Sequence, residues 1–205
     1  MRNIIYLFFL FVGMLQAQTK MTHKETVALK SKVKSQSELT KTINSDFTQY
    51  KHLDFLSNDI VTSGKLKFKA PNLVKWEYVK PFKYAVIFKN ENLHINDEGH
   101  KSDINLSASK LFKKLNHLII NSVKGDMFNE NEFEIQYFKA ENQYDVSFIP
   151  LNKKIAKYIK EFRILFNVKG EVLQIKMIEP TDDYTRIVFY NRTLNKPIPD
   201  ALFTH

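Results

Sequence analysis

The chain has 205 residues, of which 43% are hydrophobic and 13% aromatic, and its formal net charge at pH 7 is +9. It contains no cysteine, which excludes both a disulfide-stabilised scaffold and a lipid-attachment cysteine. The positive charge is compatible with anionic membranes or acidic proteins. Lysine and arginine are spread evenly and form no basic-aromatic motif, so no nucleic-acid partner is predicted.

The N-terminus has the features of a cleaved signal peptide. Arg2 supplies an early positive charge, residues 4–15 form an apolar run, and Ala17 stands at a polar break. The run is shorter than the roughly 18 residues of a membrane-spanning helix, which favours cleavage over the alternative of a retained anchor. We therefore expect residues 1–18 to be a signal peptide and residues 19–205 to form one exported domain.

Residues 20–46 are polar and rich in helix-forming residues. Their apolar residues recur with helical spacing, which predicts one amphipathic helix, with a break allowed near residues 35–37. The stripe consists of Val27, Leu29, Val33, Leu39 and Ile43.

From Asp46 onward, apolar and polar residues alternate with the period of half-buried strands. The clearest case is residues 63–69. Further strands are predicted at residues 73–79, 84–89, 92–96, 132–138, 144–149, 162–168, 171–178 and 185–190. Turn residues such as Asp97-Glu98-Gly99 and Lys169-Gly170 separate many of these segments, which predicts an antiparallel sheet. Two helices are predicted to interrupt it, at residues 107–124 and 152–158.

Residue patterns typical of catalysis or metal binding are missing from the sequence. The six histidines have no spacing that would bring two of them together as ligands, so no metal site is predicted. No GxSxG motif occurs, and five glycines form no phosphate-binding loop. The sequence therefore gives no support for an enzyme, and no cofactor is predicted.

Aromatic residues are abundant on the predicted strands, with 17 Phe and 9 Tyr in the chain. Each ring can remove roughly 150–250 Å² from water, so the apolar face of the sheet is large. Two interpretations remain open. Helices cover this face to form an ordinary core, or a sheet of about eight to ten strands curls around a hydrophobic cavity.

Residues 63–81, SGKLKFKAPNLVKWEYVKP, combine a glycine, an alternating strand, a Pro-Asn turn and a Trp-x-Tyr followed by proline. This segment resembles the LolA family, periplasmic carriers that ferry lipoproteins to the outer membrane. Later segments agree with the family in order: residues 84–95, 145–151, 183–189, and a tail at 195–203 with an Ile-Pro-x-x-x-Phe pattern.

The resemblance implies an α+β, mainly β fold. A strongly curved antiparallel sheet, an unclosed half-barrel, would be covered by an N-terminal helix and short lid helices over a hydrophobic cavity. The candidate lipid-binding residues are Leu66, Phe68, Trp76, Tyr78, Val86, Phe88, Ile135, Tyr137, Val146 and Phe148, and the candidate lid residues are Leu111, Leu115 and Leu118.

The function implied is a monomeric periplasmic carrier that binds the acyl chains of lipoproteins and moves them from the inner to the outer membrane. Lipoprotein or other acylated cargo, an inner-membrane releasing complex and an outer-membrane acceptor would be its partners. The alternatives are a carrier of another lipid or glycolipid and a non-transporting, lipoprotein-sensing module.

One position departs from the family pattern. Well-studied members have an arginine immediately before the proline of the turn, where it helps to hold the lid shut, but this chain has Ala70. Lys69 or Lys75 could substitute in part, although lysine lacks the planar fork of arginine.

Overall fold

The structure, a computed structural model, describes residues 18–89, 92–105 and 127–204. Residues 1–17 of the predicted signal peptide and the predicted helix at 107–124 lie outside these ranges. In the described part of the chain, no helix is long and apolar enough to cross a membrane.

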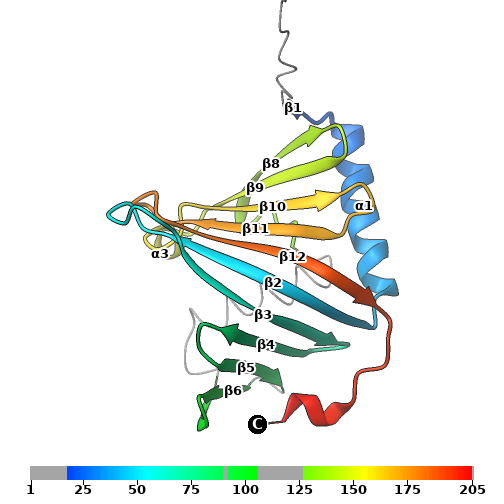
Figure 1. Cartoon of the computed structure of the whole chain (residues 1–205). Helices are drawn as coiled ribbons and strands as arrows, with labels where there is room; N and C mark the ends of the chain where they lie inside the picture. The colour runs from blue at the N-terminus through cyan, green and yellow to red at the C-terminus, as the bar shows by residue number, and fades with distance from the viewer. Residues whose placement is uncertain (1–17, 90–91, 106–126, 205) are drawn as a thin grey trace, which may run out of the picture.

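A twelve-stranded antiparallel sheet dominates the described residues (Figure 1). Its strand order is β1-β8-β9-β10-β11-β12-β2-β3-β4-β5-β6-β7, so β1 and β7 are edges and do not pair with each other. The fold is therefore the predicted mainly β, unclosed half-barrel. The strands are β1 Thr19–Lys20, β2 Thr42–His52, β3 Ile60–Lys69, β4 Leu73–Lys80, β5 Tyr84–Lys89, β6 Asn92–Asp97, β7 His100–Asn105, β8 Phe133–Ala140, β9 Gln143–Pro150, β10 Glu161–Asn167, β11 Val172–Ile178 and β12 Tyr184–Leu194.

The predicted strands are all present, and most begin and end within one or two residues of the predicted bounds. Three differences stand out. β7 and the two-residue β1 were not predicted, β12 continues to Leu194, and the predicted helix at 152–158 is the single turn α3, Lys153–Ala156.

The main helix, α1, spans His23–Leu39 and lies beside the strand ends from β8 to β12 (Figure 1). It is shorter than the predicted helix at 20–46 and is unbroken at residues 35–37. The chain turns extended at Thr40, and Ile43, assigned by its spacing to the helical stripe, belongs to β2. Val27 and Leu39 are exposed, so only Leu29 and Val33 of the predicted stripe are buried.

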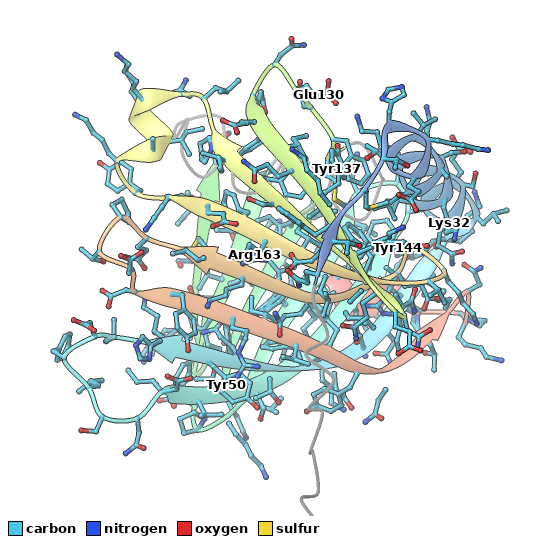
Figure 2. The ribbon with its side chains drawn as sticks, turned by 90° about the horizontal axis from the view of Figure 1, so that it is seen from above. Lys32, Tyr50, Glu130, Tyr137, Tyr144 and Arg163 are labelled. Atoms are coloured by element: carbon cyan, nitrogen blue, oxygen red, sulfur yellow. The ribbon has the colours of Figure 1, made fainter. Side chains whose placement is uncertain are left out.

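Hydrogen bonds fix α1 at its start and along its length. Thr22 and Glu25 form a capping box, which satisfies backbone N–H groups of the first turn. Glu25 also forms an ion pair with Lys139 of β8. Further along, Lys32 Nζ donates to the Val168 carbonyl at 2.7 Å and lies 5.7 Å from the Tyr144 ring centroid. Figure 2 shows Lys32 of α1 beside Tyr144 of β9. The helix therefore has a defined position against the sheet.

The two faces of the sheet have different neighbours. We call the face that bears Leu66, Trp76 and Val86 the inner face and the opposite one the outer face. On the outer face, Ile87 of β5 packs with Ile198 and Phe203 of the C-terminal tail, which ends in the 3-10 helix η2, Asp200–Phe203. The tail therefore closes the outer side of β4 and β5.

Glycine at position 64 is required by a close approach. Phe47 of β2 is fully buried, and its ring packs over Gly64 of β3. A Cβ built at Gly64 would lie 2.1 Å from the Glu77 carbonyl oxygen and 2.5 Å from Phe47 Cζ. The backbone of β4 is held by its pairing with β3 and the Phe47 ring is fully buried, so neither can move aside to accept a Cβ.

We expect Gly64→Ala to lower the free energy of unfolding by about 1–3 kcal/mol, because the added methyl overpacks this contact. Urea denaturation followed by circular dichroism measures the change. Lys65→Ala, at an exposed position of the same strand, is the control. Equal midpoints for Gly64→Ala and wild type would contradict the packing described.

The contact between Glu25 and Lys139 predicts an acid-sensitive helix start. The hydrogen bond from Lys139, with those from Thr22, lowers the pKa of Glu25 from 4.5 to about 2. Its stabilising effect is therefore complete above pH 4.5 and is lost as the pH falls toward 2. We expect the melting temperature of wild type to fall more steeply over this range than that of Glu25→Gln.

Thermal melts at several pH values make this comparison. Glu141→Gln changes an exposed carboxyl of the β8–β9 turn, and its profile should follow that of wild type. Parallel profiles for wild type and Glu25→Gln would show that the ion pair does not stabilise the fold.

Candidate binding cavity

The inner face of the sheet holds a cavity of about 530 Å³. This volume falls within the roughly 300–1,000 Å³ typical of small-molecule sites. Every strand from β9 through β7 in the sheet order contributes aliphatic or aromatic side chains to it, with Ile43 from β2 and Ile104 from β7. From β3 to β6 these are Leu66, Val74, Trp76, Tyr78, Tyr84, Val86, Phe88, Leu93 and Ile95, and from β9 to β12 they are Phe148, Phe162, Ile164, Val172, Ile175, Met177, Ile187, Phe189 and Leu194.

Six of the ten candidate lipid-binding residues lie in the cavity wall: Leu66, Trp76, Tyr78, Val86, Phe88 and Phe148. The period-2 alternation of β3, β4 and β5 places them on one face, and the register pairs Leu66 with Trp76 and Trp76 with Val86. Their role in binding lipid remains a prediction.

The structure places the other four candidates in packed clusters, outside the described cavity wall. Ile135, Tyr137 and Val146 pack in the cluster that includes Leu29 and Val33 of α1. Phe68 is buried with Phe47, Leu66 and Val74. The alternation gives the correct face for these residues, but it cannot show which part of that face is covered. The lid candidates Leu111, Leu115 and Leu118 lie outside the described residues.

Aromatic rings form the centre of the β2–β4 wall. The Trp76 ring centroid lies 4.2 Å from that of Phe47 and 6.1 Å from that of Phe189 across the cavity wall. Tyr78 continues the series, and its hydroxyl donates to Gln49 Oε1 at 2.9 Å. Burial raises the pKa of Tyr78, so the phenol is neutral at physiological pH. The aromatic part of the cavity wall is therefore polarizable and uncharged, which suits contact with an apolar molecule.

Polar groups of the cavity gather where α1 ends beside the β10–β11 turn and β12. They are Gln36 and Ser37 of α1, Thr40 at its C-cap, Glu171 of the turn and Arg192 of β12, whereas Thr185 lines the cavity near the opposite end of β12. Gly170 brings this turn against Lys32 and Val33 of α1, because a Cβ there would meet both at 3.3 Å. The cavity is therefore apolar along most of its length and polar at this end.

Sequence reasoning did not identify Arg192, the basic side chain of this polar end. A Pro, Gly or turn motif marks many strand ends, but the segment Tyr190-Asn191-Arg192-Thr193 has none of these. Asn191 adopts φ +50°, and the pairing of β12 with β2 shifts register between Tyr190 and Thr193. An asparagine tolerates this conformation better than most residues, which was the one available signal.

The two lysines considered as substitutes for the missing arginine have partners in the described structure. Lys69 Nζ donates to Asp200 Oδ1 at 2.6 Å and to the Ile198 carbonyl at 3.1 Å, and Lys75 forms an ion pair with Glu77. Lys69 therefore ties the C-terminal tail to β3, and Ala70 packs beside the Phe47 cluster.

Among the described residues, no group of three or more His, Cys, Asp or Glu could hold a metal ion.

Comparison with known proteins gives one family. Residues 38–205 match the model of the family described as outer membrane lipoprotein carrier protein LolA. No curated protein sequence matches the chain.

Several solved structures are similar in fold. The lipoprotein LppX of Mycobacterium tuberculosis is 7% identical, with a TM-score of 0.51, over 87% of this chain and 99% of that one. MucB is also 7% identical, with a TM-score of 0.52, over 89% of this chain but 63% of the longer MucB chain. A LolA superfamily protein from Nitrosomonas europaea is 11% identical, with a TM-score of 0.47, over 87% and 97% of the two chains. At these identities the first two likenesses establish the fold alone.

Trp76 offers a direct test of whether an apolar molecule enters this cavity. It is the single tryptophan of the chain and lies in the cavity wall. We expect 12-bromododecanoate to quench its fluorescence in a saturable way, because bromine quenches an indole that it contacts. Bromoacetate, which has the bromine but no apolar chain, is the control. Equal quenching by both compounds would show that the apolar chain does not enter.

Proposed function

Because the chain belongs to the LolA family of outer membrane lipoprotein carriers, we propose that it is a carrier that shields acyl chains in its cavity. The observation that carries this proposal is the cavity of about 530 Å³ walled by aliphatic and aromatic side chains of the sheet. The foremost cargo is a lipoprotein, moved from the inner to the outer membrane through the periplasm.

The energy of acyl transfer explains why such a cavity is needed. A 16-carbon chain costs on the order of 13 kcal/mol to expose, at about 0.8 kcal/mol per methylene. An aqueous compartment is therefore a barrier to any acylated molecule without cover. Because apolar contact is nondirectional, the strands can accept chains of varied length and release them to a partner that binds them more tightly.

A carrier fits the cavity better than an enzyme does. Catalysis needs convergent polar groups with matched proton affinities, whereas the described wall consists mainly of apolar side chains. The polar end of the cavity favours a second candidate within the same class, a carrier whose cargo is another lipid or glycolipid.

A non-transporting sensor is the remaining alternative. MucB has been solved in complex with MucA, so a similar fold serves there in a protein complex. This chain spans 63% of the MucB chain, and the part that it shares does not distinguish the two functions. We propose the carrier, with a releasing complex at the inner membrane and an acceptor at the outer membrane as partners.

Native mass spectrometry tests the proposal and names the cargo. The protein, purified without detergent from the envelope of its own cells, should carry an acylated molecule at one-to-one stoichiometry. A clean unliganded mass, together with failure to take up added acylated lipoprotein or dodecanoate, would refute a carrier function and favour a protein-interaction module.

A matched pair of variants tests the cavity itself. Ile95 of β6 lies in the cavity wall, and its neighbour Asn96 faces the other side of the sheet and pairs with Lys101. We expect Ile95→Glu to weaken acyl binding at least about tenfold, since a buried carboxylate must be desolvated, whereas Asn96→Glu binds as wild type does. Co-purified lipid and probe titration measure both. Equal retention of lipid by the two variants would contradict the proposed site.

A further inference from the structure

The bulge in β12 reverses the direction of its side chains. Between Tyr190, which pairs with Asp46, and Thr193, which pairs with Asn44, β12 advances three residues while β2 advances two. This is one extra residue, the defining feature of a β-bulge, and such bulges re-aim side chains. The cavity is accordingly lined by Thr185, Ile187 and Phe189 before the bulge and by Arg192 and Leu194 after it.

The same strand carries a second arginine that shows the effect. Arg186 precedes the bulge and faces the outer side, where its guanidinium lies 4.1 Å from the ring centroid of Tyr50. Arg186 and Arg192 are six residues apart, so without the bulge both would share the outer face. The guanidinium of Arg192 therefore lies at the polar end of the mainly apolar cavity.

Arg192 is incompletely satisfied in that position. One terminal nitrogen, Nη2, donates to the Val172 carbonyl, while Nε is buried and has no hydrogen-bond partner among the residues that the structure describes. The charge of Glu171 acts on Arg192, but no ion pair joins the two, and the Glu171 carboxylate accepts a hydrogen bond from Asn167 Nδ2 at 2.7 Å. Burial lowers the pKa of Arg192, but a guanidinium keeps its charge in proteins.

Within the described structure, Arg192 also lies 5.8 Å from the Phe189 ring centroid and feels the charge of Glu171, but it forms no ion pair. A partly buried charge without an ion pair is unfavourable, and an occupant that supplies the counter-charge relieves this cost. A carboxylate or phosphate matches the planar donor fork of arginine, and charge-assisted bonds to such oxygens are about twice as strong as neutral ones. An ester or amide carbonyl would also accept from Arg192, but with less gain. The adjacent apolar wall accommodates the hydrocarbon part of the same molecule.

We propose that Arg192 is a headgroup-recognition residue, and that the cavity prefers an acyl chain that carries an anionic oxygen group over a neutral one. This inference rests on the proposed function, since the apolar wall must first admit the chain. It deepens that function by naming a class of cargo: lipids with a carboxylate or a phosphate next to the acyl chain.

Displacement of a neutral fluorescent probe, N-phenyl-1-naphthylamine, tests the preference at pH 7.5. The ligands are dodecanoate, dodecyl phosphate and dodecan-1-ol, which share one chain length. In wild type we expect at least one of the anionic ligands to bind about tenfold more tightly than the alcohol. The tighter of the two identifies the group as carboxylate or phosphate. Arg192→Gln should bring this ratio close to one, because it weakens binding of the anions more than binding of the alcohol.

Arg186→Gln is the matched control, because it removes the same side chain from the same strand on the other face, and it should keep the wild-type ratio. Arg192→Lys should keep part of the preference, since it retains the charge without the fork.

The outcomes separate the two proposals. If the wild type binds all three ligands equally, the inference about Arg192 is wrong and the carrier function stands. If it binds none of them, the proposed function fails as well. If Arg192→Gln and Arg192→Lys both lose the alcohol together with the anions, Arg192 supports the β10–β11 turn through Val172 and does not recognise a headgroup.

Discussion

The rest of this structure depends on how α1 covers the apolar inner face of the sheet: it packs on one part of that face and not on the other. On the β8–β10 side, Leu29 and Val33 of α1 pack into the sheet and form a closed cluster with strand residues. On the β2–β4 side, the corresponding cluster of Phe47, Leu66, Phe68 and Val74 contains no α1 residue. Members of both clusters line the cavity, among them Phe148 and Ile164 of the first and Leu66 and Val74 of the second. Hydrophobic burial therefore completes a core around α1, while other apolar side chains of the same face line the cavity in the described structure.

Contacts on the outer and the inner face of the sheet hold the β3–β5 part of the cavity wall in place. The C-terminal tail covers Ile87 on the outer face, and Lys69 fixes that tail through Asp200 and the Ile198 carbonyl. Phe47 fills the space that Gly64 leaves between β2 and β4. Strands β3 to β5 are thus braced on both faces, which keeps the wall around Trp76 preorganised, and a preorganised site loses less conformational freedom on binding.

The sequence predicted the strands well because their alternation is strong and turn residues bound them, as at residues 63–69. It did not predict β7, because His100-Lys101-Ser102-Asp103 has no apolar alternation and an edge strand needs none. Ile43 fitted both a helical stripe and a strand, and only the extended backbone at Thr40 decides between them. Six of the ten candidate lipid-binding residues lie in the cavity wall and four lie in packed clusters, while their role in binding stays a prediction. The reason is related: period 2 predicts a face, whereas the position of α1 on that face depends on distant contacts such as that of Glu25 with Lys139.

The extra residue in β12 also bears on how such a cavity can change during evolution. Loss of the extra residue, for example Asn191, would restore one-to-one pairing while Tyr190 still pairs with Asp46 and Thr193 with Asn44, so Arg192 would still face the cavity. One further inserted residue without a bulge of its own would instead turn every later side chain of the strand to the other face. The direction of Arg192 is thus tied to the pairing of β12 with β2, and descendants of one scaffold could shorten the strand at the bulge without changing the charge of the cavity.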